Sequence, residues 1–184
     1  MYEHRLFDVE ILRIIDEQRM YWPRTAEVQA EASPSCNREY QDLRKIPWED
    51  VEAISALEAD LITRLEAATN PDAEHEAIFD ELYEDPLGIL GLDIGVASAV
   101  AALSAAGCIP ISSCNGGAYG GLHREAYPLI AFFARKRQVN LLLDCAKEAD
   151  AGLENDESGL LILYSNDIRK MRVFAAALSD RCKS

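Results

Sequence analysis

The sequence predicts an α+β fold, in which a small mixed β-sheet packed with helices follows an acidic all-helical N-terminal region. The first observation is the charge distribution: residues 1–87 hold 22 acidic and 8 basic side chains, whereas residues 88–184 hold ten of each. The second is the spacing of apolar residues, which is helical in the front half and alternates between short runs and helical patterns in the back half. We therefore divide the chain into an acidic helical region, 1–87, and an α+β domain, 88–184.

The front half predicts three helices and one connector. Phe7, Ile11 and Ile14 recur at the spacing of one helical face, which predicts a first helix over residues 5–20. Proline fixes a backbone angle that suits the first position of a helix and cannot continue one, so prolines mark the other boundaries. The remaining front-half predictions are a connector over 24–47, a helix over 47–69 that ends at Asn70-Pro71, and a helix over 72–84.

The back half predicts three helices and three strands. Asp93 is placed to cap the first of these helices, and Gly107 to end it in the left-handed conformation. Strand, helix and strand over 129–164 permit a right-handed crossover, and the two earliest strands can be antiparallel neighbours. The predicted elements are helices over 94–106 and 139–149 and strands over 108–113, 129–133 and 160–164, with the turn at 155–159 able to pair the last strand with the residues just before it. A last helix is capped by Ser165 or Asn166 and has a buried stripe from Ile168 to Leu178.

The formal net charge of -14 bears on the partners of the protein. A field of this sign repels phosphate backbones, so nucleic acid is an unlikely partner, although the basic spot Arg135-Lys136-Arg137 can touch a single anion. The acidic helices are a candidate surface for a basic protein partner or for self-association. The alternative is a solvated helical surface that keeps the protein in solution.

The first residues, the apolar runs and the cysteines of the sequence bear on the compartment of the protein. The first residues are charged, which predicts no signal peptide and a cytoplasmic protein. No run of about 20 apolar residues is present, which predicts no membrane span. The five cysteines are an odd number at uneven spacing in a chain with no predicted secretory signal, so we expect free thiols. They form no Cys-x-x-Cys pair, so neither a zinc ribbon nor a thioredoxin-type motif is predicted.

A glycine-rich loop, Ser112 to His123, is the candidate ligand site. Four of its glycines fall within six positions, and glycine lets a ligand approach backbone N–H groups closely. The alternative is structural, because Asn-Gly is a common tight turn. The candidate ligand-binding residues are Ser112, Ser113, Asn115, Gly116, Gly117 and Tyr119.

Within this loop, Cys114 is the candidate nucleophile and His123 the candidate base. An imidazole that takes the thiol proton leaves a thiolate that can attack an electrophilic carbon. The alternative is that Cys114 is an inert buried side chain. No zinc site is predicted, because the Cys-x5-Cys-x8-His spacing matches no known zinc motif. His75 is interpreted as a packing residue and Asp93 as a helix cap.

Residues Ala106 to Gly116 place a helix ending in glycine, a short strand and then Ser-Ser-Cys-x-Gly before an apolar strand and helix. Over residues 94–152 this pattern resembles the wybutosine-synthesis methyltransferase family of tRNA modification, in which a Ser-Ser-Cys-Ser-Gly-Arg motif occupies this place. It is also similar to uncharacterised bacterial proteins with a Ser-Cys-x-Gly loop. The resemblance implies an α+β scaffold with a ligand pocket at the loop and, in the first family, S-adenosylmethionine and a tRNA base as substrates. This chain has Asn115 and Gly117 where that family has Ser and Arg.

Two function hypotheses follow. The first is a cytosolic binding or interaction protein, with the Ser112–His123 loop as ligand site and the acidic helices as partner surface. The alternative is a small transferase or hydrolase that uses Cys114 and His123 and is S-adenosylmethionine-dependent by family analogy. The sequence leaves both the cofactor and the ligand unknown.

Overall fold

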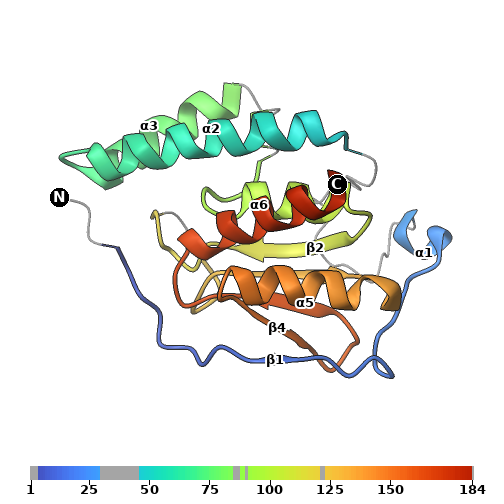
Figure 1. The fold of residues 1–184 in the computed structure, drawn as a ribbon. Helices are drawn as coiled ribbons and strands as arrows, with labels where there is room; N and C mark the ends of the chain where they lie inside the picture. The colour runs from blue at the N-terminus through green and yellow to red at the C-terminus, as the bar shows by residue number, and fades with distance from the viewer. Residues whose placement is uncertain (1–3, 30–45, 85–87, 90, 121–122, 184) are drawn as a thin grey trace.

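The fold is that of a computed structural model, which describes residues 4–29, 46–84, 88, 89, 91–120 and 123–183. A five-stranded mixed sheet packed with helices confirms the predicted α+β class (Figure 1). The elements are β1 (Arg13–Ile14), α1 (Thr25–Gln29), α2 (Trp48–Ala67), α3 (Pro71–Glu84), α4 (Ala97–Ala105), β2 (Ile109–Cys114), β3 (Leu129–Phe133), a 3-10 turn (Lys136–Gln138), α5 (Val139–Glu148), β4 (Gly152–Asn155), β5 (Leu161–Tyr164) and α6 (Arg169–Lys183).

The sheet has the strand order β1-β4-β5-β3-β2. Strands β2 and β3 pair antiparallel, as do β4 and β5, so both predicted pairings are confirmed. Strand β5 is also antiparallel to β3, so β3 and β4 run parallel with β5 between them and α5 connects them. The predicted crossover from the 129–133 strand through α5 to the 160–164 strand is wrong, because β5 is antiparallel to β3. The strand that runs parallel to β3 after α5 is β4, which is not among the predicted strands.

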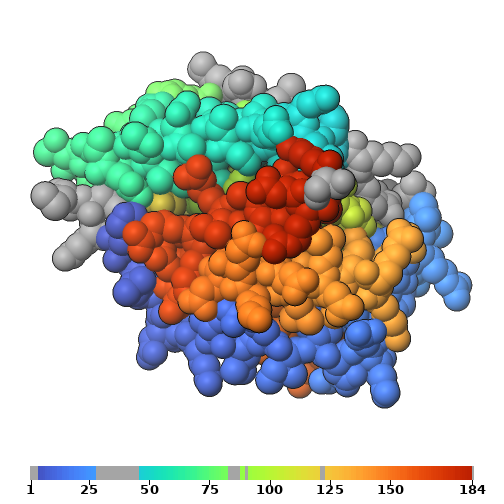
Figure 2. All heavy atoms as spheres, in the orientation of Figure 1, coloured from blue at the N-terminus to red at the C-terminus, as the bar shows by residue number. Residues whose placement is uncertain are grey.

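Three helices cover one face of this sheet, and two more lie outside them. Helices α4, α5 and α6 pack together over the sheet, and α2 packs on α4 with α3 beside it (Figure 1). In the space-filling view, α2 and α3 form an upper layer and the N-terminal segment runs along the lower edge (Figure 2). The helix-facing side chains of the three central strands are fully or almost fully buried: Ile130, Phe132, Leu153, Leu161 and Leu163. Burying such side chains is the main stabilising contribution to the fold.

Aromatic side chains cover part of the other sheet face. Tyr21 meets Phe133 edge-on with ring centroids 5.8 Å apart, and Tyr127 lies 5.7 Å from Tyr164. The Tyr164 hydroxyl accepts a hydrogen bond from the Leu12 amide at 3.0 Å. The segment before α1 is thus fixed against this face.

The predicted helix over residues 5–20 is wrong. The segment is extended and contributes β1, which pairs parallel with β4. Its amides find partners outside the segment: Phe7 donates to the Asn166 carbonyl at 2.9 Å and Asp16 to the Asn155 side chain at 2.6 Å. Its β-branched residues Val9, Ile11, Ile14 and Ile15 favour an extended chain.

The predicted role of Asp93 as the cap of the 94–106 helix is also wrong. Helix α4 begins at Ala97, and its N-terminus is capped from α2 by Glu58, which is fully buried. The Glu58 carboxylate accepts hydrogen bonds from the amides of Gly95 at 2.9 Å, Ala97 at 2.8 Å and Ser98 at 3.3 Å. A capping residue that lies 39 positions earlier in the sequence leaves no local signal. Gly107 does end the helix, with φ of +85°.

The N-terminal region is largely helical through α1, α2 and α3, although β1 and α2 share the sheet and the core with the back half. The division into 1–87 and 88–184 stays a prediction. Of the predicted connector, residues 30–45 lie outside the described residues. Across the described part of the chain, no helix is both long enough and apolar enough to cross a bilayer.

Candidate functional site

The glycine-rich loop leaves the sheet at the end of β2, where Cys114 pairs with Leu129 of β3. Side chains alternate between the faces of a strand, and the register with the buried Ile130 puts Ser113 on the helix-covered face. Ser112 and Cys114 then lie on the other face. The loop beyond them is largely buried, with Asn115, Gly116, Ala118 and Tyr119 enclosed and His123 exposed.

Asn115 is the residue that holds the loop in place. Its side-chain amide donates to the Ile94 carbonyl at 3.1 Å, and its side-chain oxygen accepts from the Gly117 amide at 2.8 Å. Its own backbone amide donates to the Asp93 carboxylate at 3.2 Å. Asn115, a predicted ligand-binding residue, therefore joins the loop to the segment before α4.

Two glycines allow the chain to close tightly on itself. Gly116 has φ of +65°, and a Cβ there would lie 2.7 Å from the Tyr127 carbonyl carbon. Gly117 has φ of +76°, and a Cβ there would lie 2.6 Å from His123 Nδ1. Both conformations favour glycine. These two positions serve close packing, and Gly117 in particular lets the His123 imidazole lie directly on the backbone.

Asp93 is half-buried and lies within reach of the charges of His75 and His123. Burial raises the pKa of the Asp93 carboxyl, while the Asn115 amide and the positive charges that His75 and His123 can carry lower it in part. His75 comes from α3 and lies 3.5 Å from where a Cβ on Gly120 would be. A carboxylate and two imidazoles from three separate segments are thus gathered beside the loop. We refer to His75, Asp93 and His123 as the histidine–aspartate cluster.

The third histidine lies on another side of the same loop. Glu66, near the end of α2, accepts a hydrogen bond from the Tyr119 hydroxyl at 3.4 Å and lies 3.5 Å from His4 Nε2. Arg169 lies near Tyr119 and Glu66 as well, and its guanidinium binds the Asp167 carboxylate. Every histidine in the chain therefore lies at this end of the sheet.

Cys114 and His123 have different surroundings. The Cys114 side chain is buried, at 6% exposure, and its sulfur accepts a hydrogen bond from the Gly116 amide at 3.4 Å. The His123 ring is exposed and packs on Gly117, and its charge reaches the Asp93 carboxyl. The nucleophile–base pairing of these two residues stays a prediction.

His75 and Asp93 are members of the histidine–aspartate cluster that the sequence analysis did not name as candidate site residues. His75 was expected to be a packing residue and Asp93 a helix cap, and neither has a motif around it. The available signal was scarcity, since the chain has three histidines in all. No group of three or more His, Cys, Asp or Glu side chains with a geometry suited to a metal ion occurs among the residues that the structure describes.

Comparison with known proteins gives no relative: no family model, no curated protein and no solved structure matches this chain. The resemblance of residues 94–152 to the wybutosine-synthesis methyltransferases stays a prediction.

Proposed function

We propose that this chain is a cytosolic binding protein that holds a small polar ligand at the histidine–aspartate cluster, beside the Ser112–His123 loop. The observation that carries the proposal is the convergence of His75, Asp93 and His123 from α3, the segment before α4 and the loop after β2. Apolar side chains would suffice to pack α3 and the segment before α4 beside the loop, so packing alone does not account for two imidazoles and a carboxylate there. Groups of this kind orient ligands and fix their specificity.

The chemistry of the cluster suits a ligand with both hydrogen-bond donors and acceptors. A neutral imidazole offers one donor and one acceptor nitrogen, and a carboxylate offers acceptors only. One Asp93 oxygen already accepts from the Asn115 amide, which fixes the carboxylate in place. A ligand hydroxyl or amino group can donate to Asp93 while the imidazoles meet its other polar atoms.

Binding accounts for the geometry better than a Cys114 nucleophile does. The Cys114 sulfur is buried and belongs to the sheet face opposite the helices. The His123 ring is exposed and packs on Gly117. A cysteine that attacks a substrate needs partial exposure and a positive environment.

The test is native mass spectrometry of the protein as purified and after mixing with the low-molecular-weight fraction of a cell lysate. We expect a bound mass on the wild type that is lost from Asp93→Asn and from His123→Ala. The matched control is Asp144→Asn, which removes an exposed carboxylate on α5 and should keep the bound mass. A bound mass retained by both site variants, or none on the wild type, would contradict the proposal.

The acidic helices supply a second part of the proposed function, the binding of a basic protein partner. Helices α2 and α3 carry twelve acidic side chains against one basic side chain, Arg64. On the outer surface of α3, Phe79 is 63% exposed between Glu76 and Asp80, which are also exposed. An exposed aromatic ring with acidic neighbours suits a partner that combines apolar and basic side chains.

This second part is tested by co-purification with the tagged protein. A partner that is captured by the wild type, released by salt, and lost from Phe79→Ala and from Glu76→Lys/Asp80→Lys supports it. Glu157→Lys, in the exposed β4–β5 turn, is the control for a charge reversal outside the helices. Capture that is unchanged by the α3 variants would refute it.

A further inference from the structure

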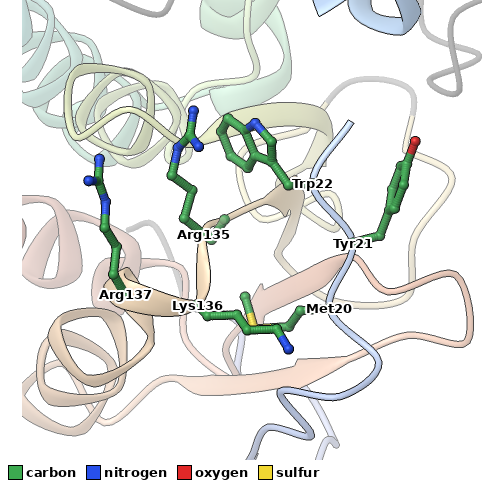
Figure 3. Close-up of a pocket in the computed structure, with 7 residues that line it drawn as sticks. Met20, Tyr21, Trp22, Arg135, Lys136 and Arg137 are labelled. Atoms are coloured by element: carbon green, nitrogen blue, oxygen red, sulfur yellow. The ribbon is translucent and has the colours of Figure 1, made fainter. Parts of the chain in front are cut away.

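A hollow of about 330 Å³ lies at the other end of the sheet, beyond the last residue of β3. Its lining comes from two segments, Met20 to Trp22 and Ala134 to Arg137. In Figure 3 Arg135 lies beside Trp22, with Arg137 and Tyr21 at opposite sides. Three consecutive cationic side chains thus border a wall made of a thioether, a phenol ring and an indole.

The aromatic wall of this hollow is held in place. The Arg135 guanidinium lies 4.1 Å from the Trp22 ring centroid, a cation–π contact. Tyr21 is fixed by Phe133 behind it and by its hydroxyl, which donates to the Glu27 carboxylate at 2.6 Å. The rings therefore need little ordering when a ligand arrives, which lowers the entropy cost of binding.

The cations have no acidic partner within the described ranges. Arg135, Lys136 and Arg137 are all exposed, and none of the ion pairs between described residues includes them. The Arg135 amide donates to the Gln138 side chain at 2.8 Å, which fixes the backbone of this segment. In a chain with a net charge of -14, three adjacent cations that make no ion pair with a described residue form a local reversal of the field.

We infer that this hollow binds a small phosphate monoester whose body is a flat ring, with the phosphate on Lys136 and Arg137 and the ring against the Trp22–Tyr21 wall. A guanidinium fork and an ammonium match phosphate oxygens, and aromatic side chains stack on flat rings. The volume falls in the range of small-ligand sites, about 300–1,000 Å³. The acidic field of the remaining protein opposes a long polyanion but not a single phosphate, which favours a free nucleotide-like ligand over a nucleic acid.

This site is separate from the histidine–aspartate cluster. Strands β2 and β3 pair Cys114 with Leu129 at one end and Ile109 with Phe133 at the other, so the two sites lie at opposite ends of these strands. The inference therefore does not depend on the proposed function, and either can fail alone.

The test is calorimetric titration with adenosine 5′-monophosphate as probe, and with adenosine and inorganic phosphate as its two halves. We expect saturable binding of the monophosphate with a dissociation constant below about 1 mM, and binding of each half at least about tenfold weaker. Lys136→Ala/Arg137→Ala should weaken the monophosphate at least about tenfold, and added salt should weaken it in the wild type. Lys147→Ala, which removes an exposed cation from α5 outside the hollow, should leave binding unchanged.

Four results would overturn the inference. No binding of the monophosphate to the wild type removes the site, and unchanged binding to the double variant places it elsewhere. Inorganic phosphate that binds as tightly as the monophosphate shows that the ring is not recognised. A single-stranded oligonucleotide that binds more tightly than the monophosphate shows that the hollow serves nucleic acid instead.

Discussion

The two ends of the sheet hold their polar side chains in different ways. At the Cys114 end, polar groups bind one another and the backbone. Glu58 caps α4, the Asn115 side chain bonds the loop to the Ile94 carbonyl, and the Asp93 carboxylate accepts from the Asn115 amide. At the Phe133 end, Lys136 and Arg137 border an open hollow, with no carboxylate partner among the residues that the structure describes. The polar groups at the Cys114 end thus contribute to the stability of the fold and also form a candidate site. The cations at the Phe133 end can bind a ligand without breaking hydrogen bonds or ion pairs within the described fold.

This difference predicts at which end a substitution lowers the free energy of unfolding. A buried group whose partner is removed loses the full interaction and stays desolvated, whereas an exposed cation returns to water. We therefore expect large losses of stability at the first end and almost none at the second.

The largest effect should come from Glu58→Ala. This substitution leaves the buried amides of Gly95, Ala97 and Ser98 without their acceptor. We expect the free energy of unfolding in urea to fall by about 3–5 kcal/mol. Asp60→Ala, an exposed position on the same helix, should change it by less than about 0.5 kcal/mol. Equal losses in the two variants would show that the Glu58 carboxylate does not stabilise the N-terminus of α4.

Gly116→Ala should have the next largest effect. The new Cβ would meet the Tyr127 backbone at 2.7 Å in a left-handed conformation, so we expect a loss of about 2–3 kcal/mol. Gly91→Ala is the matched control, because Gly91 has φ of +66° with nothing within 4 Å of its would-be Cβ. That variant should lose only about 1 kcal/mol, measured by thermal unfolding. A loss at Gly116 no larger than at Gly91 would show that the loop is not tightly closed.

The buried Glu58 carboxyl should make the stability of the protein depend on pH. Burial raises the pKa of Glu58 above its usual range, although its backbone hydrogen bonds lower it in part. A raised pKa means that the folded state binds the proton of Glu58 more tightly than the unfolded state does. The stabilisation from Glu58 is therefore complete below the pKa that the group has in the unfolded chain. It is lost as the pH rises through the pKa that the group has in the folded protein. The unfolding free energy of the wild type should therefore fall relative to that of Glu58→Gln between pH 4 and pH 8. Parallel curves for the two proteins would contradict this.

The smallest effect should come from the basic hollow. Lys136→Ala and Arg137→Ala remove exposed cations that make no ion pair with any described residue, so each should change the unfolding free energy by less than about 0.5 kcal/mol. Thermal unfolding of the two variants checks this. A loss of 2 kcal/mol or more at either position would show that the second end is structural after all.

Much of the fold could be predicted from periodicity, because the apolar runs of β3 and β5 and the stripes of α2, α3 and α6 are local signals. Residues 5–20 were misassigned because Phe7, Ile11 and Ile14 fit a helical spacing. The alternation of buried or half-buried with exposed residues from Phe7 to Ile11 is the competing two-residue period, and pairing with β4 decided between them.

The candidate site could be predicted only in part. The glycines and Asn115 mark the loop, because left-handed conformations and tight turns have local sequence signals. Glu58, His75 and Asp93 come from other segments of the chain, and the packing of α2 on α4, with α3 on α2, brings the first two toward the loop. No sequence motif around these residues indicates that they lie at the loop.

The most direct test of the central claim is an NMR titration of the three histidine rings with the low-molecular-weight fraction of a cell lysate. We expect saturable shifts of the His75 and His123 ring resonances in the wild type and their loss in Asp93→Asn. If no fraction moves these two resonances, or if the same shifts persist in Asp93→Asn, the histidine–aspartate cluster is not a ligand site.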